Sequence, residues 1–333
     1  MAEMMLAARC NAYGPPDSVV IEKVPVPEPE PDQVVVEVHA AAVNYPDVLI
    51  VANKYQVSMP VPFTPGSEVA GVVLSVGDDV ARDPEGLRPG DRVFGSMFVG
   101  AFAQQVALPA WVTMKLPPGT DFAEAAAFGV TYFTAYHSLR TVAEVQPGEW
   151  VVVLGAAGGV GLAAVELGKV LGAKVLAAAS TPEKLTQCEA QGADAVVDYT
   201  TEDLRLRIRE LTDGGADVVI DPVGGPWAEQ ALRSTRLGGR FVTVGYASGE
   251  IPRIPLNLVL LKGAIIKGFE FRTFGEHCPD EMRRDREEML ELFAQGHIHP
   301  HISAVYPLSE VAQALDDLAE RRAVGKVLID PTR

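Results

Sequence analysis

The sequence predicts an α/β protein of two domains: a mostly antiparallel β domain and a doubly wound parallel sheet of six strands. The chain of 333 residues is too long for one ordinary core. Before about residue 118, short apolar runs are cut by Pro and Gly. After Asp121, apolar runs alternate with helical patterns, as in a parallel sheet with crossover helices.

The first part of the chain predicts a twisted β-structure with one short helix near Asn44 to Val51. The stretches VPVPEPEPDQ and RDPEGLRPGDR predict loops between strands, because Pro, Gly and Asp favour turns. The predicted strands are Leu6 to Cys10, Val19 to Val24, Gln33 to Ala42, Val69 to Val76, Arg92 to Gly95 and Phe102 to Ala107.

The stretch WVVVLGAAGGVGL, residues 150–162, predicts a dinucleotide site. Val151 to Leu154 form a β-branched apolar run, as expected for a strand buried on both faces. Gly155, Gly158 and Gly161 follow at a spacing that permits a tight turn, close approach of a pyrophosphate, and close packing of the next helix.

The context of these glycines strengthens the prediction. The helical pattern from Leu162 to Leu171 and the apolar run from Lys174 to Ala179 complete a βαβ unit. A turn that binds nothing stays an alternative. A membrane helix is excluded, because glycines, Glu166 and Lys169 interrupt the run before the roughly 20 apolar residues that a bilayer requires.

The alternation of helix and strand continues to residue 271, and the segments after it do not extend the sheet. We therefore expect these last segments to return to the first domain. Further helices are predicted at Ala123 to Phe128, Thr131 to Val142, Pro182 to Gln191, Thr201 to Leu211, Trp227 to Thr235, Pro279 to Ala294 and Ser309 to Arg321. Further strands are predicted at Ala195 to Asp198, Asp217 to Asp221, Arg240 to Val244, Ala264 to Phe271, Ile302 to Tyr306 and Lys326 to Ile329.

Composition narrows the classes of function. The formal net charge of −16 would repel nucleic-acid phosphates, so nucleic-acid binding is not expected. The three cysteines, at positions 10, 188 and 278, lie in no paired motif, which indicates a reducing compartment. The first residues lack a basic region followed by an apolar core, so we expect no secretion signal, no membrane association and a cytoplasmic protein.

Seven stretches occur in one order along the chain: VNYPDVLI (43–50), PGSEVAGVV (65–73), RPGDRV (88–93), GVTYFTAY (129–136), GAAGGVGLAA (155–164), DPVGG (221–225) and RRAVGKVLI (321–329). In this order they resemble the medium-chain dehydrogenase/reductase superfamily, in its zinc-free quinone oxidoreductase (zeta-crystallin-like) branch. The resemblance covers essentially the whole chain. It implies a GroES-like catalytic domain at 1–124 and 273–333 and a Rossmann domain at 125–272.

The positions that match the catalytic zinc ligands of zinc members carry other residues. Those members use a Cys and a His, whereas the matching positions here are Asn44 and Ser67. No cysteine lies between Cys10 and Cys188 to supply a structural zinc cluster. A tetrahedral zinc site requires thiolate or imidazole ligands, so none is predicted, and Glu68 is expected to be a buried structural carboxylate.

A second possible metal site is the alternation of His297, His299 and His301, which could place three imidazoles on one strand face. Pro300 interrupts that strand, and the segment is more typical of a loop that enters one. We therefore predict no metal here.

Cofactor preference follows from charge at the end of the second strand. NAD-specific sites place an Asp or Glu there to bind the ribose 2′-OH, whereas this chain has Ser180 and Thr181, with Lys184 one turn on. The missing acid favours NADPH. Thr181 is equally typical of an ordinary helix start, and Lys184 of a solvated side chain. The resemblance implies that Lys184, Tyr199 and Arg321 or Arg322 bind the 2′-phosphate. It also implies contacts to the dinucleotide from Gly155, Gly158, Gly159, Val160, Gly161, Val223, Gly245, Phe269 and Phe271.

Metal-free hydride transfer requires an acceptor that is already electrophilic, such as a quinone or an α,β-unsaturated carbonyl. The resemblance places Asn44, Tyr55 and Thr131 around the nicotinamide. It implies that Tyr55 donates to the acceptor oxygen, that Thr131 contacts the cofactor and that Asn44 is a positioning amide. The ordinary alternatives are a helix cap for Asn44, a loop aromatic for Tyr55 and an N-cap for Thr131.

The sequence says less about the identity of the acceptor and about the oligomeric state than about the cofactor. Relatives often carry a tyrosine and an arginine where this chain has Leu49 and Val51, which favours an apolar enone or a larger hydrophobic quinone. An enoyl-thioester or 2-alkenal reductase and a non-catalytic NADPH-binding sensor stay open. Relatives are usually dimers or tetramers, and the apolar edge strand from Ala264 to Phe271 predicts a homodimer or homotetramer.

Overall fold

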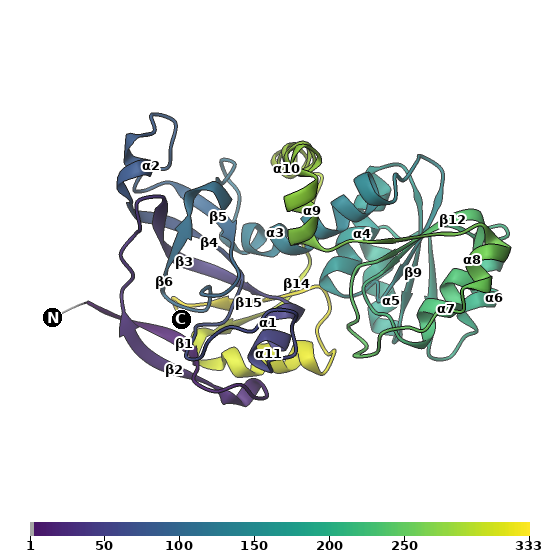
Figure 1. Ribbon diagram of the computed structural model, residues 1–333, viewed down its shortest axis with the longest axis horizontal. Coiled ribbons are helices and arrows are strands. Elements are labelled where there is room, and N and C mark those ends of the chain that lie inside the picture. The colour runs from purple at the N-terminus through teal and green to yellow at the C-terminus, as the bar shows by residue number, and fades with distance from the viewer. Residues whose placement is uncertain (1–2) are drawn as a thin grey trace. The chain divides into compact units, whose positions relative to one another are not determined.

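The computed structural model describes residues 3–333, which divide into two compact units (Figure 1). The first unit contains 3–130 and 300–333, and the second contains 131–299. This division differs from the expected boundaries, because 273–299 stays with the second unit.

The first unit is built on a seven-stranded sheet, ordered β14-β15-β3-β4-β5-β7 with β6 paired to β3. The pairs are antiparallel except β14 with β15, which confirms the predicted class. A separate antiparallel hairpin consists of β1 (Met4–Cys10) and β2 (Val19–Pro25). The sheet strands are β3 (Gln33–Val43), β4 (Glu68–Val76), β5 (Arg92–Ser96), β6 (Gln105–Pro109), β7 (Thr113–Lys115), β14 (Ile302–Pro307) and β15 (Lys326–Asp330).

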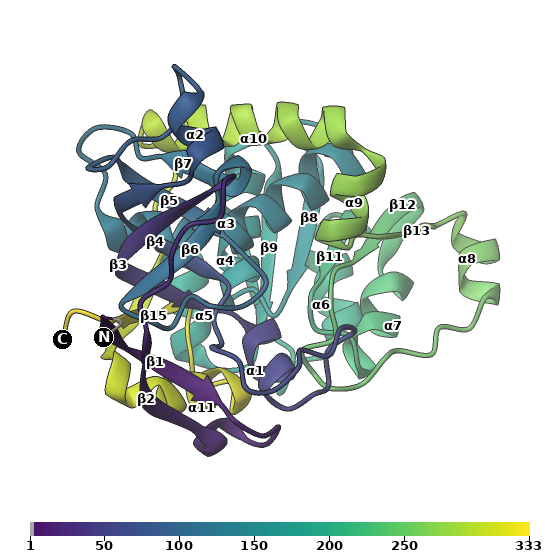
Figure 2. The same ribbon diagram turned by 60° about the vertical axis from the view of Figure 1, so that its left-hand side comes forward.

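The C-terminal segment returns to the first unit, as expected. β15 pairs antiparallel with β3, with Val327 opposite Val43. Alternate apolar residues of these strands pack in a core to which α11 also contributes. Helix α11 contacts α1 and β2 (Figure 2). The helices of this unit are α1 (Tyr45–Val51), α2 (Asp78–Arg82) and α11 (Val311–Ala319).

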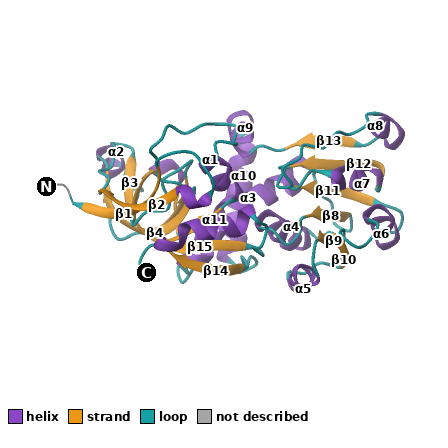
Figure 3. Ribbon diagram, turned by 90° about the horizontal axis from the view of Figure 1, so that it is seen from below, coloured by secondary structure: helices purple, strands orange, loops and turns teal. Residues whose placement is uncertain are grey.

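The second unit is a six-stranded parallel sheet in the order β10-β9-β8-β11-β12-β13. Helices α4 and α5 cover one face and α6 and α7 the other (Figure 3), so the predicted doubly wound sheet is confirmed. The strands are β8 (Trp150–Leu154), β9 (Lys174–Ala179), β10 (Ala195–Asp198), β11 (Ala216–Asp221), β12 (Thr235–Thr243) and β13 (Ile265–Gly268). The helices are α4 (Gly159–Val170), α5 (Pro182–Ala190), α6 (Leu204–Leu211), α7 (Pro226–Arg233), α8 (Asn257–Lys262), α9 (Phe271–His277) and α10 (Pro279–Ala294).

The predicted break between two helices near Gly129 is wrong. One helix, α3 (Phe122–His137), runs through that position and ends in a π-helical turn, Ser138–Val142. A Cβ on Gly129 would lie 2.7 Å from Glu68 Oε1, so this glycine makes room for a buried carboxylate and does not end the helix. The interpretation of Thr131 as an N-cap is therefore wrong, because Thr131 lies inside α3.

The predicted last strand, Ala264 to Phe271, is too long. β13 ends at Gly268, and Glu270 caps α9 by accepting the backbone N–H groups of Arg272 and Thr273. Phe271 is therefore the first residue of a helix. The following helix, α10, does not return to the first unit as expected, because its Asp285 is buried against α3 in the second unit.

Candidate functional site

Six predicted cofactor residues follow the carboxyl ends of the six parallel strands. Because these ends meet at one edge of a parallel sheet, the six residues line a single edge, where open α/β sheets bind ligands. They are Gly155 after β8, Ser180 after β9, Tyr199 after β10, Val223 after β11, Gly245 after β12 and Phe269 after β13.

The glycine-rich turn leaves no space for side chains at two positions. Gly155 has φ of 56°, and a Cβ there would lie 2.4 Å from Cγ2 of Val223. A Cβ on Gly161 would lie 2.4 Å from the Gly155 carbonyl oxygen, so α4 packs directly on the turn. Gly158 is exposed at the N-cap of α4, and Gly159 and Val160 begin that helix. The N-terminal amides of α4 therefore suit an anion.

Asp221 shapes the neighbouring DPVGG turn and was missed among the predicted site residues. Its Oδ1 accepts the backbone N–H groups of Val223 at 2.9 Å and Gly224 at 2.8 Å. Its Oδ2 is buried without a hydrogen-bond partner within residues 3–333. Burial raises the pKa of Asp221, although the two backbone N–H groups oppose that rise. An Asp that ends an apolar strand and precedes Pro and Gly was the signal in the sequence.

The segment predicted to bind the ribose end of the cofactor has the ordinary features of a helix N-terminus. Thr181 is the N-cap of α5, and its Oγ1 accepts the Lys184 backbone N–H at 3.4 Å. Ser180, before it, is half-buried. The Tyr199 ring lies 4.6 Å from that of Trp227, between centroids.

The two predicted arginines belong to the first unit. Arg322 is paired with Asp316 at 2.6 Å and with Asp317 at 3.0 Å. Arg321 is exposed and has φ of 57°. The guanidinium of Arg322 therefore already has carboxylate partners, which makes it a weaker phosphate ligand than the resemblance implies.

Asn44 belongs to a buried polar group in the first unit, here called the Asn44 cluster: Asn44, Asp47, Ser67, Glu68 and Lys326. The Nζ atom of Lys326 donates to Asn44 Oδ1 at 2.7 Å and to Glu68 Oε2 at 3.2 Å. The Nδ2 atom of Asn44 donates to Glu68 Oε2 at 3.2 Å and to Ser67 Oγ at 3.3 Å. Ser67 is partly buried, and the other four members are at most 4% exposed.

Asp47 joins this cluster through α1. Its Oδ2 accepts the Asn44 backbone N–H at 2.7 Å, so Asn44 is the N-cap that the sequence left as an alternative. Burial raises the pKa of Asp47 to about 7, although the Asn44 backbone, Ser67 and Lys326 oppose that rise. Lys326 was missed by the sequence analysis, where a charged residue at the start of the apolar run KVLI was the available signal.

The remaining predicted residues occupy ordinary positions. Tyr55 is half-buried against the core of the first unit, with its ring centroid 6.0 Å from that of Phe98. Thr131 is 5% exposed within α3. Val51 is 1% exposed in the core, so it does not make a binding face apolar as expected, whereas Leu49 is half-buried.

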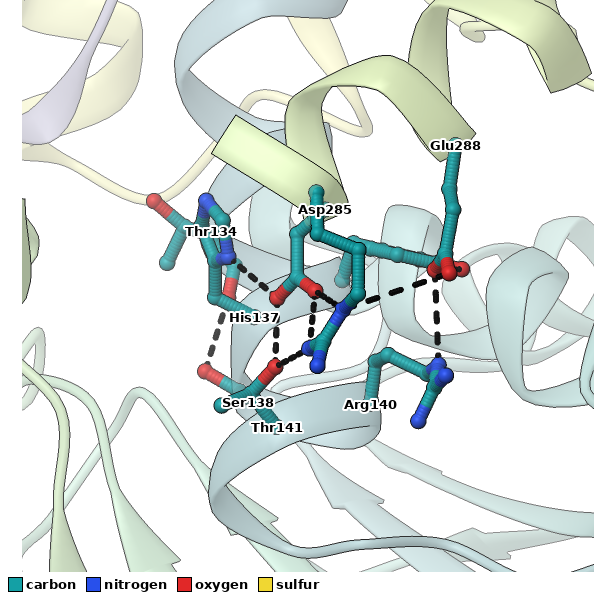
Figure 4. A network of polar contacts seen from close by, with 9 residues as sticks. Thr134, His137, Ser138, Arg140, Thr141, Asp285 and Glu288 are labelled. Carbon is teal, nitrogen blue, oxygen red and sulfur yellow. Dashed lines mark hydrogen bonds and ion pairs between the residues drawn. The ribbon is translucent and has the colours of Figure 1, made fainter. Parts of the chain in front are cut away.

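A second buried network lies in the second unit, between α3, the π-helical turn and α10 (Figure 4). The Nδ1–H of His137 donates to Asp285 Oδ2 at 2.7 Å, and the Thr141 hydroxyl donates to the same oxygen at 2.5 Å. Arg284 Nε donates to Asp285 Oδ1 at 2.9 Å. The His137 ring also lies 5.8 Å from that of Phe269, so the network supports the segment that follows β13.

A Rossmann unit with a glycine-rich turn and a GroES-like β unit in one chain define the class of protein: a two-domain, dinucleotide-dependent oxidoreductase. Residues 30–118 match the family described as alcohol dehydrogenase GroES-like domain, and 159–295 match the one described as zinc-binding dehydrogenase. The chain belongs to the medium-chain dehydrogenase/reductase superfamily, in its zinc-free quinone oxidoreductase branch.

Individual relatives are similar over nearly the whole chain. A quinone oxidoreductase-like protein 2 homolog of Nematostella vectensis is 39% identical over 328 residues, which cover 97% of this chain and 88% of that protein. The quinone oxidoreductase of Sus scrofa is 32% identical over 331 residues, 98% of each chain. Escherichia coli quinone oxidoreductase, solved as a complex with NADPH, matches with a TM-score of 0.90 at 28% identity, covering 98% of this chain and 100% of that one.

The zinc that one family description implies does not suit the residues present. The Asn44 cluster offers an amide, a hydroxyl, two carboxylates and an ammonium, whereas zinc prefers thiolate and imidazole. Within residues 3–333 there is no group of three or more His, Cys, Asp or Glu side chains that could hold a metal. No helix in the same range is long and apolar enough to cross a membrane.

Proposed function

We propose that this protein binds NADPH along the strand-end edge of its second unit and reduces quinones or α,β-unsaturated carbonyls by direct hydride transfer. The observation that carries the proposal is the tightly packed glycine turn at that edge, with Ser180 in place of an acid after β9. The structure of the similar E. coli quinone oxidoreductase as an NADPH complex supports the choice of cofactor.

The chemistry follows from the donors around Asn44. They do not suit a Lewis-acid metal, so the acceptor itself must be electrophilic. Quinones and conjugated carbonyls meet this requirement, and hydrogen-bond donors then stabilise the charge that develops on the acceptor oxygen. NADPH supplies the hydride, and the chain binds and orients the two reactants.

The proposal is tested by following the absorbance of NADPH with a panel of quinones, enones and enoyl thioesters. We expect turnover with quinones or enones. Preferred turnover of enoyl thioesters would instead identify an enoyl-thioester reductase. Firm NADPH binding without turnover of any acceptor would contradict the reductase proposal and favour a sensor.

Replacement of Ser180 by Asp tests the cofactor preference. A carboxylate after β9 would repel a 2′-phosphate and accept a hydrogen bond from a ribose 2′-OH. We expect the Kd for NADPH to rise at least about tenfold, equivalent to about 1.4 kcal/mol, and the Kd for NADH to fall. Thr186→Asp, which adds the same charge at an exposed position of α5, is the control. A wild-type preference for NADH would contradict the proposal.

Tyr55→Phe tests the proposed donor to the acceptor oxygen. Loss of a donor that stabilises developing negative charge is expected to lower kcat about tenfold to a hundredfold, with the Kd for NADPH unchanged. Tyr13→Phe is the matched control, because Tyr13 is an exposed tyrosine of the same unit whose hydroxyl donates to the Met59 carbonyl. Full turnover by Tyr55→Phe would show that Tyr55 is an ordinary loop aromatic.

We also propose that the protein is a homodimer or homotetramer that pairs through β13. This strand is at the edge of its sheet, and exposed apolar side chains surround it: Leu260 (82% exposed), Leu261 (71%), Ile265 (47%) and Ile266 (42%). An exposed apolar edge strand favours association. Light scattering is expected to give a multimer for the wild type and a monomer for Ile266→Lys, whereas Trp111→Glu in the first unit stays multimeric. A monomeric wild type would overturn this.

All three cysteines are free, and two of them, Cys10 and Cys188, are buried. Free thiols persist in a reducing environment. Together with the sequence composition, this supports the proposal of a cytoplasmic protein.

A further inference from the structure

Lys326 is the only positive charge of the Asn44 cluster, and it is 3% exposed. A lysine ammonium in the interior is costly unless it is paired and hydrogen-bonded. Here the Nζ atom has two partners, Asn44 Oδ1 at 2.7 Å and Glu68 Oε2 at 3.2 Å. The position of Lys326 is further fixed by its backbone N–H, which donates to the His301 carbonyl at 2.8 Å.

Sheet register brings these three residues together. Val327 of β15 is opposite Val43 of β3, so Lys326 lies beside Asn44, the residue that follows β3. Ala42 of β3 is in turn opposite Glu68, the first residue of β4. Three adjacent strands therefore present an ammonium, an amide and a carboxylate at one place.

The ammonium fixes the orientation of the Asn44 amide. Only the Oδ1 atom of an asparagine can accept from an ammonium, so Nδ2 must point the other way. There it donates to Glu68 Oε2 at 3.2 Å and to Ser67 Oγ at 3.3 Å. Ser67 Oγ receives this bond while the Ser67 hydroxyl hydrogen-bonds to the Asp47 carboxylate, so the hydroxyl is held from both sides, and Ser67 is the least buried member of the cluster.

The ammonium also balances the buried charge. The second oxygen of Glu68, Oε1, accepts the Val130 backbone N–H at 2.6 Å, and Gly129 leaves the space for it. Lys326 therefore compensates a fully engaged carboxylate. The same ammonium connects this carboxylate to the Asn44 amide.

We propose that Lys326 is a positioning residue of the reductase. Its buried ammonium, rather than a metal ion, orients the Asn44 amide and, through that amide, the Ser67 hydroxyl. The inference rests on the proposed reductase function. Its consequence is that Lys326, which is buried and already bonded to Asn44 and Glu68, acts on the chemical step through Asn44 and Ser67.

The test compares Lys326→Met with Lys326→Met/Glu68→Gln, Lys326→Arg and the wild type. Lys326→Met leaves Glu68 buried without its cation, so this single variant is expected to lose stability. The double variant removes both charges with little change of volume and is expected to fold. Lys115→Met is the control, because Lys115 forms an exposed ion pair with Asp91 in the same unit.

Measurements are the melting temperature, the Kd for NADPH, and kcat and KM with the acceptor that the wild type reduces best. We expect the folded double variant to bind NADPH within about twofold of the wild type and to lose about tenfold to a hundredfold in kcat, as misplaced groups do. Lys326→Arg is expected to recover part of kcat. The Lys115→Met control stays at the wild-type values.

A folded double variant with wild-type kcat would overturn the inference, because Lys326 would then serve only to pair with Glu68. An unchanged kcat with a raised KM would also overturn it, since only binding would be affected. A wild type that reduces no acceptor would overturn the proposed function and this inference with it. An active wild type with an unaffected double variant would overturn the inference alone.

Discussion

Replacement of Gly161 by Ala is expected to weaken NADPH binding more than any other single methyl group added to this chain. The new Cβ would lie 2.4 Å from the Gly155 carbonyl oxygen and 2.6 Å from the carbonyl carbon and oxygen of Ala156. These are backbone atoms of the glycine turn and cannot rotate away. Helix α4 would have to move off the turn, taking its N-terminal amides away from the pyrophosphate.

We expect the Kd of Gly161→Ala for NADPH to rise about a hundredfold, equivalent to about 2.7 kcal/mol, and overpacking to lower the free energy of unfolding by about 1–3 kcal/mol. Gly275→Ala is the matched control, because the Cβ that it would add within α9 meets only the flexible end of the Met282 side chain, at 3.1 Å. Fluorescence titration with NADPH measures both. Wild-type affinity in Gly161→Ala would show that the cofactor does not bind at this turn.

The second large effect is expected at Asp285, which is fully buried between α10 and α3. Its carboxylate accepts hydrogen bonds from His137, Thr141 and Arg284. Asp285→Ala would leave the buried donors of His137 and Thr141 without their acceptor, and each unsatisfied buried donor costs about 1–3 kcal/mol. Urea denaturation measures the loss. Asp280→Ala, whose ion pair with Arg283 at the start of α10 is exposed, is expected to change stability by less than about 1 kcal/mol.

The same network predicts a dependence of stability on pH. Burial alone would raise the pKa of Asp285, but hydrogen bonds from His137, Thr141 and Arg284 hold it below its ordinary value. A depressed carboxyl pKa stabilises the fold at pH values above the unfolded value, about 3.9, and this contribution is lost as the pH falls through the folded value. Asp285→Asn should therefore differ from the wild type most at neutral pH and least in acid. A difference independent of pH would contradict this origin.

Much of the second unit could be predicted because its signals are local. The apolar run 151–154 and the glycines after it determine a strand, a turn and the start of α4 within a few residues. One exception arose where a distant residue decides the outcome, and another where a neighbouring helix cap does. Gly129 predicts a break between two helices, but it makes room for Glu68, which comes from β4. The end of β13 was placed too late, because the Glu270 cap of α9 interrupts an apolar run.

The residues of the candidate site are likewise of two kinds, those that local sequence patterns predict and those that depend on distant partners. The positions of Ser180 and Thr181, between a strand and a helix, are predicted by the local strand and helix patterns. Thr181 is the N-cap of α5. Lys326 could not be assigned a role, because its partners Asn44 and Glu68 are 282 and 258 residues away in the sequence. No periodicity connects residues at such separations; the register of β15, β3 and β4 does.

The central claim, direct hydride transfer from NADPH to a conjugated acceptor, is tested most directly with NADPH that carries deuterium at C4 of the nicotinamide. The purified protein is incubated with this cofactor and an enone, and the product is analysed by mass spectrometry. We predict one deuterium at the β-carbon of the saturated ketone, where it does not exchange with water. A reduced product without deuterium under stereospecific labelling of either C4 position, or no reduction of any quinone or enone, would contradict the account.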